Sequence, residues 1–331
     1  MLKYLIANFE RVTFLFQRCG VDESQLLAIK NKWEQKKVLD QKINQLGKKK
    51  NQLVKKDKET KKTDPLVISL NQELIVQEKK LTILEKELKE LVSQLPNLPA
   101  PEIPLEENKI VDTAKYKHLI EHQLTFDQIA QKLGIVNDKF GVKLSGNKFT
   151  VYQGLGAQLV HALINFMLAE QQKKGYQMFV LPYLVNEQNL YHTGQLPKFK
   201  ADLYKIENSK LYLIPTAEVP LINLYQNEIL LEKELPLKLC SYSPCFRAEA
   251  GAGGQEGKGL IRLHQFHKIE LVRIVAPEKS DQHLKEIVED ARHILHQLKI
   301  THRVSELCTK ELGFSAAKQY DIEVLLPVSK R

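Results

Sequence analysis

The segment at residues 246–271 combines the side chains best suited to chemistry in this chain. Arg247 and Glu249 stand one residue apart at the end of a predicted strand, and a glycine-rich loop follows them. A second predicted strand carries Phe266 and Glu270 at an even spacing, so their side chains share one face of a sheet. Arginine can bind a phosphate through two nitrogens, an aromatic ring can stack on a base, and a carboxylate can bind an amine. The segment therefore predicts a nucleotide-binding site.

Short strands and amphipathic helices surround this segment. A strand at residues 176–185 contains Pro182, which has no amide donor, so we expect this strand at a sheet edge or a subunit boundary. Since the strands do not alternate regularly with helices, we expect an antiparallel sheet with helices packed outside, which is an α+β domain. The other predicted strands are at residues 210–221, 238–249, 260–275 and 320–327, and the predicted helices are at residues 126–133, 154–174 and 284–298.

Size and composition indicate a soluble globular protein. The 331 residues are enough for two domains, with 43% hydrophobic and 27% charged residues. No apolar run approaches the roughly 18 residues that a membrane span needs. Residues 1–16 are apolar, but Glu10 lies within them and no cleavage site follows, so we expect an ordinary helix. The four cysteines form no CxxC pair, which favours reduced thiols in a cytoplasmic protein.

Residues 26–95 have the pattern of two long helices that pair as an antiparallel hairpin. In the second helix, leucines recur at alternating steps of four and three residues, as in a coiled-coil seam. The first helix repeats this pattern, and Pro65 can open the second helix in its first turn. The predicted seam positions are Leu39, Ile43, Leu46, Lys50 and Leu53 in the first helix, and Leu70, Leu74, Gln77, Leu81, Leu84, Leu88, Leu91 and Leu95 in the second.

Positive charge is concentrated in the first helix and the turn. Residues 30–62 contain 13 lysines and four acidic residues, a net charge of +9 that equals the net charge of the whole chain. A solvated coiled-coil face is the plainer interpretation, but the second helix is nearly balanced in charge, which favours binding of a polyanion by the first. We therefore expect contact with nucleic-acid phosphates. The lysines expected to make it are Lys48, Lys49, Lys50, Lys55 and Lys56.

A proline-rich connector divides the chain. Residues 96–108 contain four prolines in 13 positions, which predicts an extended linker. The resulting organisation is an arm over residues 1–95, the linker, and an α+β domain over residues 109–331.

Taken in order, these segments resemble the seryl-tRNA synthetases, a family of class II aminoacyl-tRNA synthetases, from residue 1 to 331. That family joins an amino-terminal antiparallel coiled-coil arm to an antiparallel-sheet catalytic domain. The segment at 154–182 is similar to class motif 1, which builds the dimer interface, and 246–271 is similar to motif 2. Further similar segments are TGQLPKF at 193–199, IPTAEVPL at 214–221 and LGFSAAKQYDIEVLLP at 312–327.

The resemblance assigns roles to individual residues. Arg247 matches the motif 2 arginine that holds the α-phosphate of ATP, which makes it the catalytic residue, and Glu249 matches the carboxylate near the adenine amine. Ala248 stands where the family often has serine and would contact ATP through its backbone. Phe266 matches the ring that stacks on adenine. The serine-binding residues that the resemblance implies are Thr216, Ala217, Glu218 and Glu270.

The same resemblance implies a serine–tRNA ligase. Such an enzyme uses ATP and Mg²⁺ to convert serine to seryl-adenylate and then transfers the seryl group to tRNA(Ser), with tRNA(Sec) as a second acceptor. Residues 1–95 would be the tRNA-binding domain and residues 109–331 the catalytic domain of a cytoplasmic homodimer that does not contact membranes.

Two departures from the family pattern leave alternatives open. Gln255 and Lys258 stand where the motif 2 loop usually has arginines. The chain also ends before the strand that carries the family's Mg²⁺-binding acid and before motif 3, so we expect no metal ligand in this chain and weak serine activation by the 331 residues alone. One alternative is a ligase that loads amino acids onto carrier proteins, against which the arm argues. The other is a truncated, non-enzymatic RNA-binding paralogue.

Overall fold

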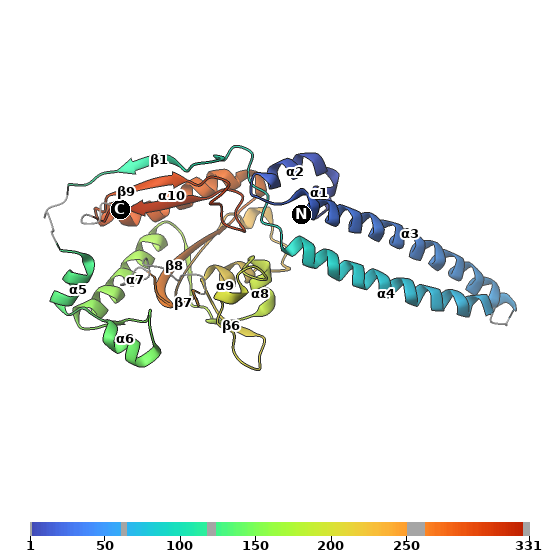
Figure 1. Cartoon of the computed structure of the whole chain (residues 1–331), viewed down its shortest axis with the longest axis horizontal. Helices are drawn as coiled ribbons and strands as arrows, with labels where there is room; N and C mark the ends of the chain where they lie inside the picture. Colours follow the sequence, from blue (N-terminus) through green and yellow to red (C-terminus); the bar gives the residue numbers. More distant parts are fainter. Residues whose placement is uncertain (1, 61–64, 118–123, 250–261, 327–331) are drawn as a thin grey trace. The chain divides into compact units, whose positions relative to one another are not determined.

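The contacts divide the chain into two units (Figure 1). The first comprises residues 1–108 and 307–319, and the second comprises residues 109–306 and 320–331. The computed structural model describes residues 2–60, 65–117, 124–249 and 262–326, with the backbone alone for residues 56–60.

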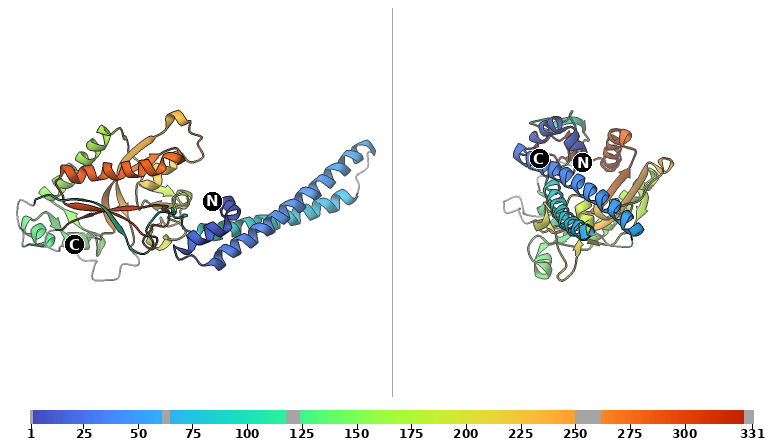
Figure 2. Two further views of the ribbon diagram at one scale, coloured as in Figure 1. Left: turned by 90° about the horizontal axis from the view of Figure 1, so that it is seen from above. Right: turned by 90° about the vertical axis from the view of Figure 1, so that its right-hand side faces the viewer.

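Two long antiparallel helices form most of the first unit. Helix α3 (Glu23–Thr60) and helix α4 (Pro65–Ser93) lie side by side in every view (Figures 1 and 2). The predicted hairpin is confirmed, and α4 begins at Pro65, where the missing amide hydrogen has no acceptor to lose. Ion pairs between the helices follow the antiparallel register, namely Lys32–Glu87 at 2.5 Å, Lys36–Glu85 at 2.9 Å and Lys42–Glu73 at 2.9 Å.

The predicted leucine seam holds α3 and α4 together. None of its positions is exposed: in α4 the buried members are Leu74, Gln77, Leu84 and Leu88, and in α3 Leu46 is buried. Lys50 is half-buried in the seam, which a lysine can tolerate when its aliphatic stem packs and its ammonium group stays in water.

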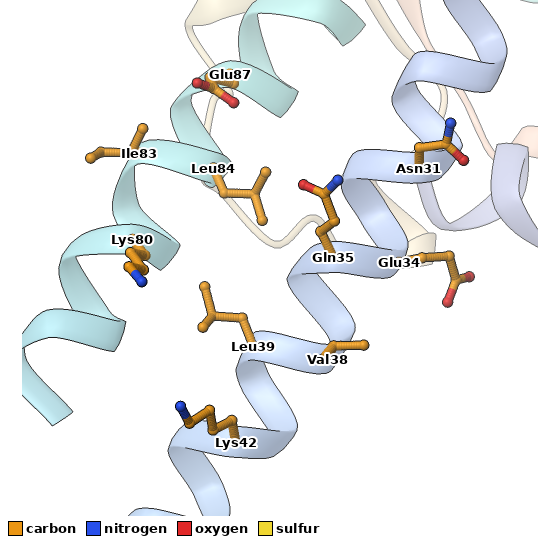
Figure 3. Close-up of a pocket in the computed structure, with 10 residues that line it drawn as sticks. All are labelled: Asn31, Glu34, Gln35, Val38, Leu39, Lys42, Lys80, Ile83, Leu84 and Glu87. Atoms are coloured by element: carbon orange, nitrogen blue, oxygen red, sulfur yellow. The ribbon is translucent and has the colours of Figure 1, made fainter. Parts of the chain in front are cut away.

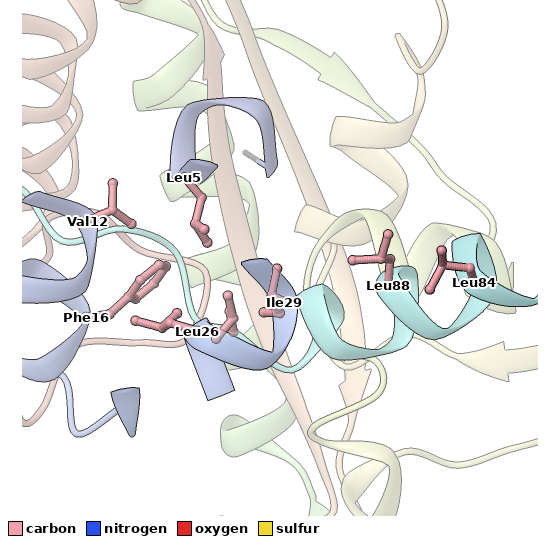
Figure 4. Close-up of a cluster of buried hydrophobic side chains, with 8 residues drawn as sticks. Leu5, Val12, Phe16, Leu26, Ile29, Leu84 and Leu88 are labelled. Atoms are coloured by element: carbon pink, nitrogen blue, oxygen red, sulfur yellow. The ribbon is translucent and has the colours of Figure 1, made fainter. Parts of the chain in front are cut away.

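The root of the hairpin packs against two short helices. Residues 1–16 were expected to form one helix, but they form α1 (Leu2–Ala7) and α2 (Phe9–Gln17). Figure 4 shows their apolar side chains directed at the start of α3 and the end of α4. Burying each large side chain contributes about 1.5–3 kcal/mol. The buried cluster comprises Leu5, Val12, Phe16, Leu26, Ile29, Leu84, Leu88 and Leu95.

The proline-rich segment at 96–108 is hydrogen-bonded along its length to residues 307–319. The amide of Asn97 donates to the carbonyl of Phe314, and the amide of Ala100 donates to that of Ala317. Arg18 of the first unit also donates through Nη2 to the carbonyl oxygen of Ile103 at 2.9 Å. These bonds order the segment that the prolines keep extended.

The second unit is built on small sheets with helices around them, which confirms the predicted α+β class. One three-stranded sheet has the order β4-β7-β8, with β4 parallel and β8 antiparallel to β7, and another has the antiparallel order β1-β9-β10 (Figure 1). Their bounds are β1 Lys109–Ala114, β4 Gln177–Phe179, β7 Leu237–Phe246, β8 Gln265–Ile274, β9 His302–Glu306 and β10 Tyr320–Val324. Two-stranded pairs are β2 (Val136–Asn137) with β3 (Val151–Tyr152) and β5 (Leu184–Asn186) with β6 (Leu211–Leu213). The helices are α5 Phe126–Leu133, α6 Asp138–Ser145, α7 Leu155–Lys173, α8 Glu187–His192, α9 Glu218–Asn223 and α10 Ser280–Gln297.

Three predicted strands differ from the structure. The strand predicted at 210–221 is wrong beyond Leu213, because the Thr216 hydroxyl accepts a hydrogen bond from the amide of Glu218 and α9 starts there. Pro220 is tolerated because it lies in the first turn of that helix. The strand predicted at 260–275 is β8, which starts only at Gln265. The one predicted at 176–185 splits into β4 and β5 around Pro182, and β4 lies at a sheet edge within the described residues, as predicted.

A buried ionic network connects β8 with α10. The guanidinium of Arg273, only 4% exposed, donates to the Tyr176 hydroxyl at 2.8 Å and pairs with Glu286 and Asp290. Burial raises the pKa of the Tyr176 phenol, so this hydroxyl stays protonated and donates to Asp290 at 2.7 Å. The network anchors the end of β8 distant from Phe266.

Candidate active site

The site is built on one face of the β7–β8 hairpin. In the antiparallel register Cys245 is opposite Phe266, Ser243 is opposite Lys268, and Ser241 is opposite Glu270. Side chains opposite each other in a ladder lie on the same face. The three β7 residues are small and fully buried, whereas their β8 partners are only partly buried. The small side chains thus lie beside a phenyl ring, an ammonium group and a carboxylate on this face.

Arg247 lies just after β7 and is fixed from three sides. Its backbone amide donates to the carbonyl of His264 at 2.9 Å, and its Nε donates to the carbonyl of Pro215 at 3.3 Å. Its guanidinium carbon lies 5.0 Å from the centre of the Phe266 ring, which is cation–π distance. The arginine is therefore held beside the aromatic ring before any ligand arrives.

The segment between β6 and α9 contributes a second wall. Thr216 is 3% exposed, and its hydroxyl donates to Oε2 of Glu270 at 2.5 Å. Ala217 is fully buried and leads into Glu218 at the start of α9. Lys268 Nζ lies 2.6 Å from the same oxygen of Glu270. The fold thus brings together residues that are 54 positions apart in the chain.

Glu218 is the second carboxylate of this wall. Burial raises its pKa, and the negative charge of Glu270 raises it further, while Lys268 and Arg247 lower it. Burial disfavours the charged form of an acid, so this carboxylate gains from a cationic ligand. The arrangement suits binding of an ammonium group.

Glu249 and Ala248 lie at the border of the loop that follows β7. The amide of Ala248 donates to the carbonyl of Asp202 at 2.8 Å, and Glu249 has a left-handed backbone with φ of 50°. The Glu249 carboxylate pairs with Arg262 Nε at 2.5 Å. The structure therefore does not join Glu249 to the carboxylates near Thr216, and Arg262 occupies Oε2 of Glu249. The predicted loop positions Gln255 and Lys258 lie outside the described residues.

Lys268 was not among the predicted site residues. It stands two positions from Phe266 and two from Glu270, so the period of two that predicted their common face also included the lysine. His264, which was expected to have a structural role, donates through Nδ1 to the backbone carbonyl of Arg247 at 3.0 Å and contacts the Phe149 ring.

The predicted RNA-binding lysines are all in α3, in the first unit. Lys48, Lys49 and Lys55 are exposed, Lys50 is half-buried, and the side chain of Lys56 lies outside the described residues. Between α3 and α4 there is also a groove that contains none of these lysines (Figure 3). Its lining mixes apolar and charged side chains, namely Asn31, Glu34, Gln35, Val38, Leu39, Lys42, Lys80, Ile83, Leu84 and Glu87.

The described residues supply neither a metal cluster nor a membrane helix. Glu218 and Glu270 are two acids near each other, but no group of three or more His, Cys, Asp or Glu side chains could hold a metal ion in the described part of the chain. No described helix combines the length and apolarity needed to cross a bilayer.

Comparison with known proteins places this chain in a family. A family profile described as the class II tRNA synthetase core domain (G, H, P, S and T) matches residues 199–331. The serine–tRNA ligase of Heliobacterium modesticaldum is 47% identical over 242 residues, which cover 70% of this chain and 56% of that protein. The serine–tRNA ligase of a Sulfurihydrogenibium species is 49% identical over 243 residues, which cover 72% of this chain and 58% of that protein.

A solved structure of a seryl-tRNA synthetase also matches this chain. The seryl-tRNA synthetase of Pyrococcus horikoshii, determined with ATP, has a TM-score of 0.91 and 29% identity, and the match covers 99% of this chain and 81% of that one. The chain spans little more than half the length of the curated relatives it matches. With its coiled-coil arm and its hairpin site, the chain belongs to the seryl-tRNA synthetase family of class II aminoacyl-tRNA synthetases.

Proposed function

We propose that the protein activates serine with ATP and transfers the seryl group to tRNA(Ser). The observation that carries this proposal is the contact of Thr216 and Glu270 beside the stacked pair of Arg247 and Phe266. The first pair offers hydrogen-bonding groups for a small polar amino acid, and the second offers a cation and a ring for a nucleotide. One face of the β7–β8 hairpin thus provides for both substrates of an adenylation reaction.

The amino acid would lie between Glu218 and Glu270. Glu218 would bind the substrate ammonium group, and the Thr216–Glu270 pair would accept a hydrogen bond from the serine hydroxyl. A site whose buried polar groups need that hydroxyl rejects an analogue without it, because those groups would then be left unpaired. Ala217, which is fully buried, would contribute its backbone between Thr216 and Glu218.

The nucleotide would lie along Arg247 and Phe266. We infer that the Arg247 guanidinium binds the α-phosphate, that the Phe266 ring stacks on adenine, and that Ala248 and Glu249 bind the adenine edge. The Pyrococcus relative was solved with ATP, which supports nucleotide binding by this chain.

The chemistry needs no nucleophilic side chain. The serine carboxylate attacks the α-phosphorus, pyrophosphate leaves, and the ribose hydroxyl at the tRNA 3′ end then attacks the activated carbonyl. Arg247 would offset negative charge at phosphorus, and the fixed site would align the two substrates. Mg²⁺ would come with ATP and neutralise its phosphates, but the described residues do not form a site for it.

The arm would bind the tRNA. Lys48, Lys49, Lys50 and Lys55 are positioned on a helix whose excess positive charge suits a phosphate backbone. We propose tRNA(Ser) as the acceptor and tRNA(Sec), which is charged with serine first, as a second one. Binding of this kind depends on phosphates and shape and weakens steeply with salt.

We also propose a homodimer in the cytoplasm. Helix α7 and strand β4, the motif 1 elements, expose apolar side chains, among them Leu155 at 70% and the neighbouring Val180 at 90%. These exposed apolar side chains would be covered in the dimer interface. All four cysteines are free, which suits a reducing compartment.

Pyrophosphate exchange across the twenty amino acids, measured with the complete gene product, tests the proposal. Serine should support exchange, and alanine and threonine should support little. Exchange that depends on another amino acid, or none at all with intact folding, would refute the serine assignment. The non-enzymatic RNA-binding alternative is not favoured, because the curated relatives of this chain are serine–tRNA ligases.

A further inference from the structure

The two oxygens of the Glu270 carboxylate have different surroundings. Thr216 Oγ1 donates to Oε2 at 2.5 Å, and Lys268 Nζ lies 2.6 Å from the same Oε2. Within the described residues no hydrogen bond is made to Oε1. One oxygen is thus occupied by two donors of the protein, and the other is left to accept a hydrogen bond from a ligand.

Lys268 also neutralises the charge of Glu270. The Glu270 side chain is 16% exposed and the Lys268 side chain 31% exposed, so water screens the pair only partly. A carboxylate already paired with an ammonium group gains little from a second ammonium group, but it still accepts a hydrogen bond from a hydroxyl. Among the residues that the structure describes, Glu218 makes no ion pair of this kind: Lys268 and Arg247 act on it only through their charges.

We propose that Lys268 is a positioning and specificity residue, which makes Glu270 select a substrate hydroxyl and reserves Glu218 for the substrate ammonium group. This inference rests on the proposed serine activation. It assigns a different substrate group to each of the two acids in that site. Lys268 and Thr216 both hold Oε2 of the Glu270 carboxylate. An amino acid with a second ammonium group in place of the serine hydroxyl is excluded, because Lys268 repels it.

The test compares two substrates in pyrophosphate exchange by the complete gene product. One is serine, and the other is 2,3-diaminopropionate, which has an amine where serine has its hydroxyl. The variants are Lys268→Met, which keeps the chain length without the charge, and Lys268→Arg, which keeps the charge. Lys233→Met, an exposed lysine of the same unit, is the matched control.

We expect Lys268→Met to lower kcat/KM for serine and to shift the preference between the two substrates towards diaminopropionate by at least about tenfold. Lys268→Arg should retain the preference of the parent protein, and Lys233→Met should change nothing. If Lys268→Met keeps the parent ratio while its thermal unfolding is unchanged, the lysine has no role in selection and the inference is wrong.

A second measurement does not depend on activity. Carbon-13 NMR of glutamate-labelled protein, with the Glu218 signal assigned from Glu218→Gln, gives the pKa of Glu218 directly. Because Lys268 lowers the pKa of Glu218, Lys268→Met should raise it, while Lys268→Arg and Lys233→Met should not. An unchanged pKa would show that Lys268 does not act on this pair of acids. If the parent protein activates some other amino acid, the proposed function fails, and this titration still decides the electrostatic role of Lys268.

Discussion

Thr216 donates its hydroxyl hydrogen to Oε2 of Glu270 across 2.5 Å, and this bond connects the start of α9 with the middle of β8. The same hydroxyl accepts the amide hydrogen of Glu218 at 3.2 Å. One hydroxyl group therefore holds the Glu270 carboxylate and the backbone of Glu218.

Replacing Thr216 should separate serine binding from ATP binding. In Thr216→Val the shape is kept but both hydrogen bonds are lost, so kcat/KM for serine should fall by about 10- to 100-fold. The KM for ATP should change little. Thr216→Ser retains the hydroxyl and should stay close to the parent protein. Equal increases of both KM values in Thr216→Val would mean that the threonine only supports the fold.

Arg247 should not be replaceable by lysine. The guanidinium both bonds to the Pro215 carbonyl and lies over the Phe266 ring, and the compact ammonium of Lys cannot do both. Loss of one such donor to a developing charge costs about 10²- to 10³-fold in kcat. We expect losses on that scale in pyrophosphate exchange for both Arg247→Ala and Arg247→Lys. Substantial rescue by lysine would show that only the charge matters.

The raised pKa of Glu218 leads us to expect that the reaction depends on pH. Because burial raises the pKa of this acid, it takes up a proton at a pH closer to neutral than an ordinary glutamate does. Its ionised form would bind the substrate ammonium group, so kcat/KM for serine should fall on acidification above the usual carboxylate range. The pH profile of pyrophosphate exchange measures this. A profile that is flat down to the ordinary glutamate pKa would contradict the role.

The same raised pKa makes Glu218 a cost to stability. A raised carboxyl pKa in the folded state adds stability below the unfolded pKa, and that stability is lost as the pH rises through the folded pKa. Glu218→Gln should therefore raise the melting temperature at pH 7–8 relative to the parent protein. At a pH below the pKa of a free glutamate this gain should vanish. A gain of the same size at both pH values would point to packing instead.

The local patterns of the sequence predicted much of this fold. The leucine repeat predicted the α3–α4 hairpin, and the period of two predicted the common face of Phe266 and Glu270. Both patterns can be recognised because they depend only on residues close together in the chain. The contact between Thr216 and Glu270 has no local signal, and only the resemblance brought those residues together. The start of α9 was missed because an apolar run such as 210–221 suits a strand as well as a helix. Lys268 was missed because a lysine in an alternating strand is typical of a solvent-facing position.

The lysines of α3 should matter for tRNA and not for adenylation. The triple variant Lys48→Ala, Lys49→Ala and Lys55→Ala should weaken tRNA binding and reduce its salt dependence by roughly one counterion for each phosphate that no longer has a lysine beside it. Pyrophosphate exchange should be unchanged. The matched control is the triple alanine variant of Lys79, Lys86 and Lys89, which are exposed on α4. An equal effect of both variants on binding would show that net charge, and not the α3 lysines, binds the tRNA.

We expect Arg273 to contribute strongly to the stability of the second unit. Its side chain is 4% exposed and paired with Glu286 and Asp290, so Arg273→Met would remove the buried cation that the two acids share. Breaking a buried pair from one side costs about 3–5 kcal/mol. Thermal unfolding of the variant should show a loss on this scale, whereas Lys285→Met, which breaks an exposed pair with Asp281, should lose less than about 1 kcal/mol. Similar losses in both variants would contradict a structural role for the network.

The most direct test of the adenylation site is a crystal structure of the complete gene product with a non-hydrolysable sulfamoyl analogue of seryl-adenylate. The account predicts the serine hydroxyl within hydrogen-bond distance of Oε1 of Glu270, the ammonium group against Glu218, and adenine stacked on Phe266. An analogue bound away from the β7–β8 hairpin, or bound there with its hydroxyl and ammonium groups exchanged, would contradict it.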